Sequence, residues 1–168
     1  MSITVTKRNG KKEDLNLEKL HKVVFWATEG ITGVSASEVE IKSHIQFYNG
    51  ITTKDIQETL IKATADLITE ETPNYQFVAG RLINYGLRKE VYGKFDPCHI
   101  FEIVDKNTNS GFYDPALLST YSEGEWNYIN NFIKHQRDED FTYVAMEQFR
   151  GKYLVQNRVT KEIFETPQ

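Results

Sequence analysis

The residues best suited to chemistry lie in the first 22 positions, where cationic side chains gather beside a predicted helix start. This stretch holds six Lys or Arg residues against three Asp or Glu residues, whereas the whole chain has a net charge of -4. Lys7, Arg8 and Lys19 could neutralise a triphosphate, and a helix beginning after Asn16 would add unpaired backbone N–H groups and a favourable dipole. We therefore expect an anion-binding site here. The alternative is a solvated basic face that binds no ligand.

The rest of the sequence carries few signs of catalysis. The signatures of phosphate-binding loops, dinucleotide-binding folds and serine hydrolases are absent. No two of the four histidines have the i, i+4 spacing that places two metal ligands on one helical face, so we expect no metal site. The charge-rich run 135–140 is interpreted as a solvated turn or a salt-bridge cluster. Because no pair of carboxylates is brought together by the sequence alone, we predict no catalytic residue in this chain.

The composition is typical of a folded globular protein of 168 residues, with 39% hydrophobic side chains. The single Cys98 cannot form an internal disulfide and fits a reducing compartment. No stretch approaches the roughly 20 apolar residues that cross a membrane, and the amino terminus does not resemble a signal peptide. We therefore expect a cytoplasmic protein with neither membrane nor nucleic acid as a partner.

A hairpin and the helix after it would position the basic residues. Residues 3–7 alternate apolar and polar side chains, and Asn9-Gly10 is a strong signal for a two-residue turn before a second strand. Asn16 can cap a helix that ends near Gly30. The basic side chains are therefore expected around the turn and in the first turn of this helix.

Three further helices are expected before residue 94. Capping residues mark their starts, and Gly or Pro marks their ends. Apolar residues recur at helical intervals along each, which indicates one buried face per helix. The expected helices begin at Ser35 or Ser37, at Thr52 or Thr53, and near Asn74, and they end before Gly50, Pro73 and Gly93. We predict that residues 1–94 form the first domain.

Residues 95–168 show a looser pattern. Helices are predicted around 100–107, after Pro115, from Ser122 and over 138–149, and the segment 153–165 looks like a β-hairpin. These segments lack a convincing core of their own, and a terminal strand pair has exposed edges unless something covers it. We therefore predict a helical region with a terminal hairpin that packs on another part of the protein.

Short motifs along the chain are similar to one known family. Val5-Thr6-Lys7-Arg8-x-Gly10 followed by Asn16-Leu17-x-Lys19-Leu20 resembles the opening of an ATP-cone, the regulatory nucleotide-binding module of ribonucleotide reductase large subunits. Further similar segments are 44–51, 61–67, 75–76, 87–89, 92–93 and 151–160. The resemblance covers nearly the whole chain and is to class I enzymes of the bacterial and bacteriophage type.

The resemblance implies a mainly α fold with a small β part (α+β), in which a four-helix unit is capped by a short β-sheet. It implies ATP or dATP as an allosteric effector, with Mg²⁺ at the phosphates. By position, the residues expected to contact the triphosphate are Lys7, Arg8 and Lys89. Those expected near the sugar, base or phosphates are Glu13, Asn16, Lys19 and Thr53, and those expected to line the base pocket are Val5, Leu15 and Leu20.

Two positions depart from the family pattern. Relatives that respond to dATP carry histidines in the third and fourth helices, where this chain has Gln57 and Gly86. The chain thereby lacks two potential phosphate or ribose partners, and a glycine inside a helix costs about 1 kcal/mol relative to alanine. Inhibition by dATP is therefore not expected to be complete.

The resemblance further implies the amino-terminal regulatory and structural part of ribonucleoside-diphosphate reductase, an oxidoreductase that makes deoxyribonucleotides for DNA replication. The catalytic barrel lies outside this stretch, either because the chain is truncated or because the subunit is naturally split. The expected partners are the carboxy-terminal remainder of the large subunit and the radical-generating small subunit. A bacteriophage-encoded chain would work in the host cytoplasm.

Two other functions fit parts of the sequence. One is a degenerate cone with a purely structural role in subunit assembly, which Gln57 and Gly86 favour. The other is a nucleotide sensor that controls transcription, but such proteins carry four zinc-binding cysteines and this chain has only Cys98.

Overall fold

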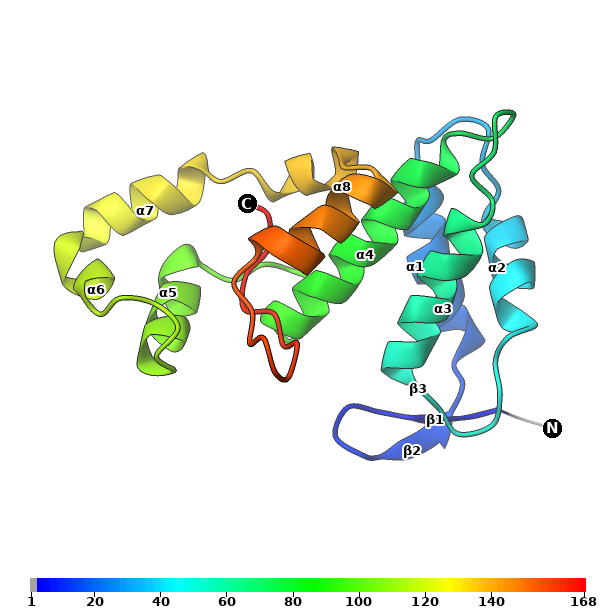
Figure 1. Ribbon diagram of the computed structural model, residues 1–168, viewed down its shortest axis with the longest axis horizontal. Helices are drawn as coiled ribbons and strands as arrows, with labels where there is room; N and C mark the ends of the chain where they lie inside the picture. The colour runs from blue at the N-terminus through cyan, green and yellow to red at the C-terminus, as the bar shows by residue number, and fades with distance from the viewer. Residues whose placement is uncertain (1–2) are drawn as a thin grey trace. The chain divides into compact units, whose positions relative to one another are not determined.

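The computed structural model describes residues 3–168 and is mainly helical with one small sheet, as predicted (Figure 1). The described chain forms two compact units. The first contains the residues up to Ile83 together with Asp140–Met146, and the second contains Asn84–Glu139 together with Glu147–Gln168. The domain boundary predicted near residue 94 stays a prediction, and the first two residues of that domain lie outside the described range.

The sheet of the first unit has three short strands in the order β2-β1-β3. Their bounds are Thr4–Thr6 for β1, Lys12–Asp14 for β2 and Ile51–Thr52 for β3. β1 pairs antiparallel with β2 through the predicted hairpin, in which Gly10 takes a positive φ of 79° that favours glycine. β1 also pairs parallel with β3, a strand that the sequence did not predict.

Four helices follow in the order that the sequence predicted (Figure 1). They are α1 (Leu17–Thr28), α2 (Ala36–His44), α3 (Thr53–Ala65) and α4 (Tyr75–Val91). The side chains of Asn16, Ser35 and Thr52 each accept a hydrogen bond from the backbone N–H three residues on, which identifies them as the N-caps of the first three helices. Ser35 and Thr52 thus settle the two alternatives that the sequence left open. α2 ends at His44, well before Gly50, and turns lead from there to β3.

The first unit has an apolar core between its helices. α2 packs against both α1 and α3. Tyr75, at the start of α4, is almost fully buried, and its hydroxyl accepts a hydrogen bond from the backbone N–H of Ser35 at 2.9 Å and donates one to Glu38. The capped start of α2 is therefore tied to α4. The most deeply buried side chains of this unit include Val24, Val39, Ile51, Leu60, Ile61, Val78, Leu82 and Met146.

The segment Asp140–Met146 comes very close to the first half of α4. A Cβ atom added at Gly80 would lie 2.1 Å from the carbonyl oxygen of Phe141, closer than real Cβ contacts. Gly80 is part of α4 and has no positive φ, so the requirement for glycine is one of space. Close packing of backbone against backbone fixes this segment on the helix.

Gly80→Ala is expected to destabilise the protein by about 2 kcal/mol or more, because the added methyl group can be accommodated only if backbone moves. Gly124→Ala is the control, since Gly124 also lies in a helix and nothing occupies the space around its Cβ position. The helix propensity of alanine should make that change neutral or slightly stabilising. Urea unfolding of both variants would measure the difference, and equal stabilities would contradict the close approach.

The second unit contains the end of α4 and a set of shorter helices. They are α5 (Ile100–Asn109), α6 (Ala116–Thr120), α7 (Glu123–Phe132), the 3-10 turn η1 (His135–Asp140) and the π-helical turn η2 (Phe149–Tyr153). Between η1 and η2 lies α8 (Tyr143–Gln148), most of which belongs to the first unit. α5 packs against α6 and α7. α7 begins with a full capping box between Ser122 and Glu125, as the sequence predicted. The helix predicted over 138–149 is divided into η1 and α8.

The terminal hairpin is reduced to a turn and one bridge. The backbone of Asn157 bonds Glu162 across the predicted turn, and Gln156 and Ile163 form an isolated antiparallel bridge. Phe164 is buried, its ring stacks on that of Phe112 at 3.8 Å, and its carbonyl accepts a hydrogen bond from Asn107. The second unit therefore covers part of this segment itself, and the packing of the segment on another part of the protein stays a prediction.

Candidate nucleotide-binding site

The central strand β1 organises the predicted site. Val5, its middle residue, pairs with Glu13 on β2 and with Ile51 on β3, and its side chain is 4% exposed. The predicted site residues Lys7 and Arg8 follow β1 directly, at the start of the turn. The pairing therefore brings residues from three separate stretches of the chain together.

Glu13 lies among lysine side chains. Lys7 Nζ is 2.7 Å from Glu13 Oε2, and both side chains are partly exposed. The hydrogen bond from Lys7, and after it the positive charges of Lys7, Lys11 and Lys19, hold the pKa of Glu13 below its usual range. Lys7, Lys11 and Lys19 therefore form a basic cluster around Glu13, whose carboxylate partly compensates their charge.

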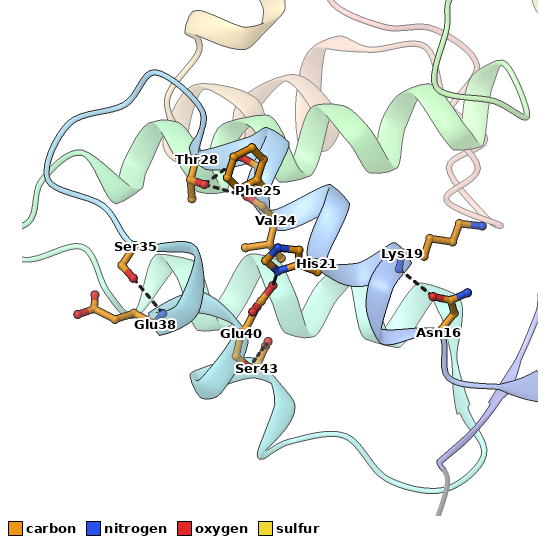
Figure 2. Close-up of polar contacts among 10 residues, drawn as sticks. All are labelled: Asn16, Lys19, His21, Val24, Phe25, Thr28, Ser35, Glu38, Glu40 and Ser43. Carbon is orange, nitrogen blue, oxygen red and sulfur yellow. Dashed lines mark hydrogen bonds and ion pairs between the residues drawn. The ribbon is translucent and has the colours of Figure 1, made fainter.

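The start of α1 places the next predicted site residues. Asn16 Oδ1 accepts a hydrogen bond from the backbone N–H of Lys19 at 2.8 Å, and Figure 2 shows this bond with the Lys19 side chain extending away from it. Asn16 and Lys19 are exposed, whereas Leu15 and Leu20 on either side are partly buried. The helix start therefore presents polar groups to solvent beside apolar ones.

The start of α3 reaches the same sheet. Thr6 pairs with Thr52, so Lys7 and Thr53, the residues that follow them, leave the parallel pair at the same end. Near the other end of β1, the backbone N–H of Leu15 bonds the carbonyl of Ile3. Two helix amino termini therefore flank a three-residue strand, which spans about 10 Å. Both contribute partial positive charge, which suits an anion.

Lys89 is the one predicted site residue that belongs to the second unit. It lies on α4 after the unit boundary, and its Nζ is 5.1 Å from the centre of the Tyr85 ring. The first unit thus brings together the other nine residues on or beside the hairpin, α1 and the start of α3.

Gln57, one of the two departures from the family pattern, has a structural partner. Its side-chain amide donates a hydrogen bond to the carbonyl oxygen of Leu82 at 2.7 Å, which ties α3 to α4. No feature of the sequence predicted this bond. Its amide is therefore already bonded to the protein backbone.

A second tie that sequence reasoning missed joins α1 to α2. His21 Nδ1 lies 2.7 Å from Glu40 Oε1, and Figure 2 shows the two side chains meeting between the helices. Thr28 and Ser43 bond carbonyls of their own helices instead. The His21–Glu40 pair helps to hold the helix that carries Asn16 and Lys19.

Other kinds of site find little support. Within residues 3–168, no three His, Cys, Asp or Glu side chains gather in a way that could hold a metal ion. Burial raises the pKa of the Cys98 thiol, which fits an unreactive cysteine. No described helix is both long and apolar enough to cross a membrane.

Comparison with known proteins identifies the family. The model of the ATP cone domain matches residues 3–90, which include the sheet, the first three helices and nearly all of α4. The chain belongs to the ATP-cone family. Membership in this family indicates a nucleotide effector, ATP or dATP.

Curated proteins similar to this ATP-cone chain extend the match beyond residue 90. It is 53% identical over 167 residues to the ribonucleoside-diphosphate reductase subunit alpha of Haemophilus influenzae and 52% identical to ribonucleoside-diphosphate reductase 1 subunit alpha of Escherichia coli. It is 43% identical to the corresponding subunit of Enterobacteria phage T4. These alignments cover 99% of this chain but 22% of each relative, so the chain spans about a fifth of their length.

Asn16→Ala is expected to lower the free energy of unfolding by about 1 kcal/mol, because the N-cap of α1 loses its side-chain acceptor. Asn16→Ser keeps an acceptor and should restore most of the loss. Urea unfolding monitored by circular dichroism would measure both variants. Equal stability of the alanine variant and the unmodified protein would contradict the capping role.

Proposed function

We propose that this chain is the amino-terminal regulatory part of a ribonucleoside-diphosphate reductase large subunit and that ATP or dATP binds to it as an allosteric effector. The observation that carries the proposal is the continuous similarity over 99% of the chain, which extends beyond the ATP-cone into the second unit. A chain that shared only the nucleotide-binding module would be expected to match such subunits up to about residue 90.

The geometry supports a triphosphate at the basic cluster. Lys7, Arg8 and Lys19 would bind phosphates, with the amino termini of α1 and α3 adding backbone donors. Lys7 would have to exchange its bond to Glu13 for a phosphate oxygen, which frees the Glu13 carboxylate. Val5, Leu15 and Leu20 offer apolar surface for the base, and Lys89 is proposed as a further phosphate ligand.

Mg²⁺ is compatible with this arrangement without a protein-built metal cage. Such ions at nucleotide sites are held mainly by phosphate oxygens and water, with one or two carboxylates. Glu13 is the carboxylate that the cluster supplies. The absence of a denser ligand group among the described residues therefore fits a nucleotide-borne ion.

Lys19→Ala is expected to weaken ATP binding at least about tenfold, because one charge-assisted hydrogen bond to phosphate contributes about 1.5–3 kcal/mol. Lys22→Ala is the matched control: Lys22 is one turn further along α1 and pairs with Glu18. Isothermal calorimetry on the full chain would compare the two. An equal loss in both variants would show general electrostatic attraction rather than a site at the helix start.

Because the side-chain amide of Gln57 already bonds Leu82, we expect the chain to prefer dATP over ATP only weakly. Gln57→His replaces the residue with the one expected in dATP-responsive relatives, and it should raise the affinity for dATP relative to ATP. Calorimetry with both nucleotides on the same variant provides its own control. If the ratio of the two dissociation constants stays that of the unmodified chain, Gln57 does not set the preference.

A structural role without a ligand is the second candidate, since Gln57 already bonds the protein itself. No heat and no thermal shift with either ATP or dATP would support that role.

The assembly claim is tested separately. Mixing the chain with the rest of the large subunit and with the radical-generating subunit should restore ribonucleotide reduction, and the same mixture without the chain is the control. Activity that does not depend on the chain would contradict the proposal.

A further inference from the structure

Asp138 is a completely buried acid in the second unit. It lies on η1, is 0% exposed, and neither of its carboxylate oxygens has a hydrogen-bond partner among the described residues. The prediction of a solvated turn over 135–140 is therefore wrong at this position, although Gln136 and Arg137 beside it are exposed. An ionised carboxylate here would lose its hydration with no hydrogen bond in exchange.

A buried cation from α4 lies in the same unit. Arg88 is 4% exposed, its Nη2 donates to the carbonyl oxygen of His135 at 2.7 Å, and its guanidinium lies 5.1 Å from the centre of the Phe95 ring. Its Nε, like the Asp138 carboxylate, has no partner within residues 3–168. The positive charge of Arg88 therefore acts on Asp138 although no hydrogen bond joins the two side chains.

We propose that Asp138, buried without a hydrogen-bond partner, is a proton-binding site of the second unit and that its ionisation offers Arg88 an acceptor that competes with the carbonyl of His135. Burial raises the pKa of Asp138 to about 7, against the lowering effect of Arg88 and with a further rise from Glu139. Burial also lowers the pKa of His135 and raises that of Tyr92, which leaves both neutral at this pH. Arg88 and Glu139 are therefore the charged groups that act on Asp138.

Proton release from Asp138 would affect a cavity of about 560 Å³ in the same unit. Its wall includes Arg88, His135 and Glu139. Asp138 lies between His135 and Glu139 in the same turn, and Arg88 donates a hydrogen bond to the carbonyl oxygen of His135. A shift of Arg88 from the His135 carbonyl to Asp138 would therefore change the shape of this wall.

The direction of the pH effect follows from the raised pKa. The folded state binds the Asp138 proton more tightly than the unfolded state, so this contribution to stability is complete below about pH 4 and is lost as the pH rises through about 7. Between pH 5 and pH 8, the folding equilibrium constant should fall by roughly a hundredfold from this group alone.

Urea unfolding of the full chain from pH 5 to pH 8.5 tests the proposal with two variants. Asp138→Asn should remove the fall, so that it is more stable than the unmodified protein at pH 8 and close to it at pH 5. Asp140→Asn, at an exposed aspartate of the same turn, should retain the fall. Lower stability of Asp138→Asn at pH 8 would overturn the proposal, because it would show that Asp138 works as an ionised partner of Arg88.

A direct titration does not depend on how well a variant folds. The side-chain carboxyl ¹³C signal of Asp138, followed by NMR in the unmodified protein, should titrate with a midpoint near pH 7. Arg88→Gln removes the cation that favours ionisation and should move the midpoint higher. A midpoint near pH 4 in the unmodified protein would overturn the proposal.

Discussion

The pairing of β1 with two partners is the constraint on which the rest of the first unit depends. One three-residue strand bonds β2 through a hairpin and β3 across more than forty residues of sequence. Because β3 runs directly into α3, and β2 into α1 after two residues, this pairing places the amino terminus of α3 at the end of β1 that leads into the basic turn and that of α1 near the other end of the same strand. The strand is too short to be stable alone, so the helices that bury Val5 and Ile51 must hold it in place.

The electrostatics of this region suit the proposed exchange of a carboxylate for a phosphate. A cluster of lysines without compensation would repel itself, and Glu13 relieves that repulsion while it remains close to solvent. The Lys7–Glu13 pair is partly exposed, so breaking it costs little, and a polyphosphate can replace the carboxylate as the partner of Lys7. Stability of the empty protein and affinity for an anion are thus compatible in the same few residues.

Local sequence signals predicted much of this arrangement, because caps and turns depend on neighbouring residues. Asn9-Gly10, Asn16 and the Ser122 capping box stand where the sequence placed them. β3 escaped prediction because two residues before a helix carry no periodic pattern, and their role comes from pairing with β1. The bond from Gln57 to Leu82, the contact of Gly80 with Phe141 and the burial of Asp138 are likewise products of tertiary packing. Membership in the ATP-cone family was predictable from motif order, whereas the contacts of individual site residues were not.

The central claim is that a nucleotide binds where β1, α1 and α3 meet. Backbone amide NMR of the full chain during titration with ATP tests this claim most directly, because each residue reports its own environment. The account predicts that the largest shift changes fall on residues 5–8, 13–20 and 52–54, with saturation at a single affinity. Saturable binding whose shift changes lie elsewhere, or no change at these residues at millimolar ATP, would contradict it.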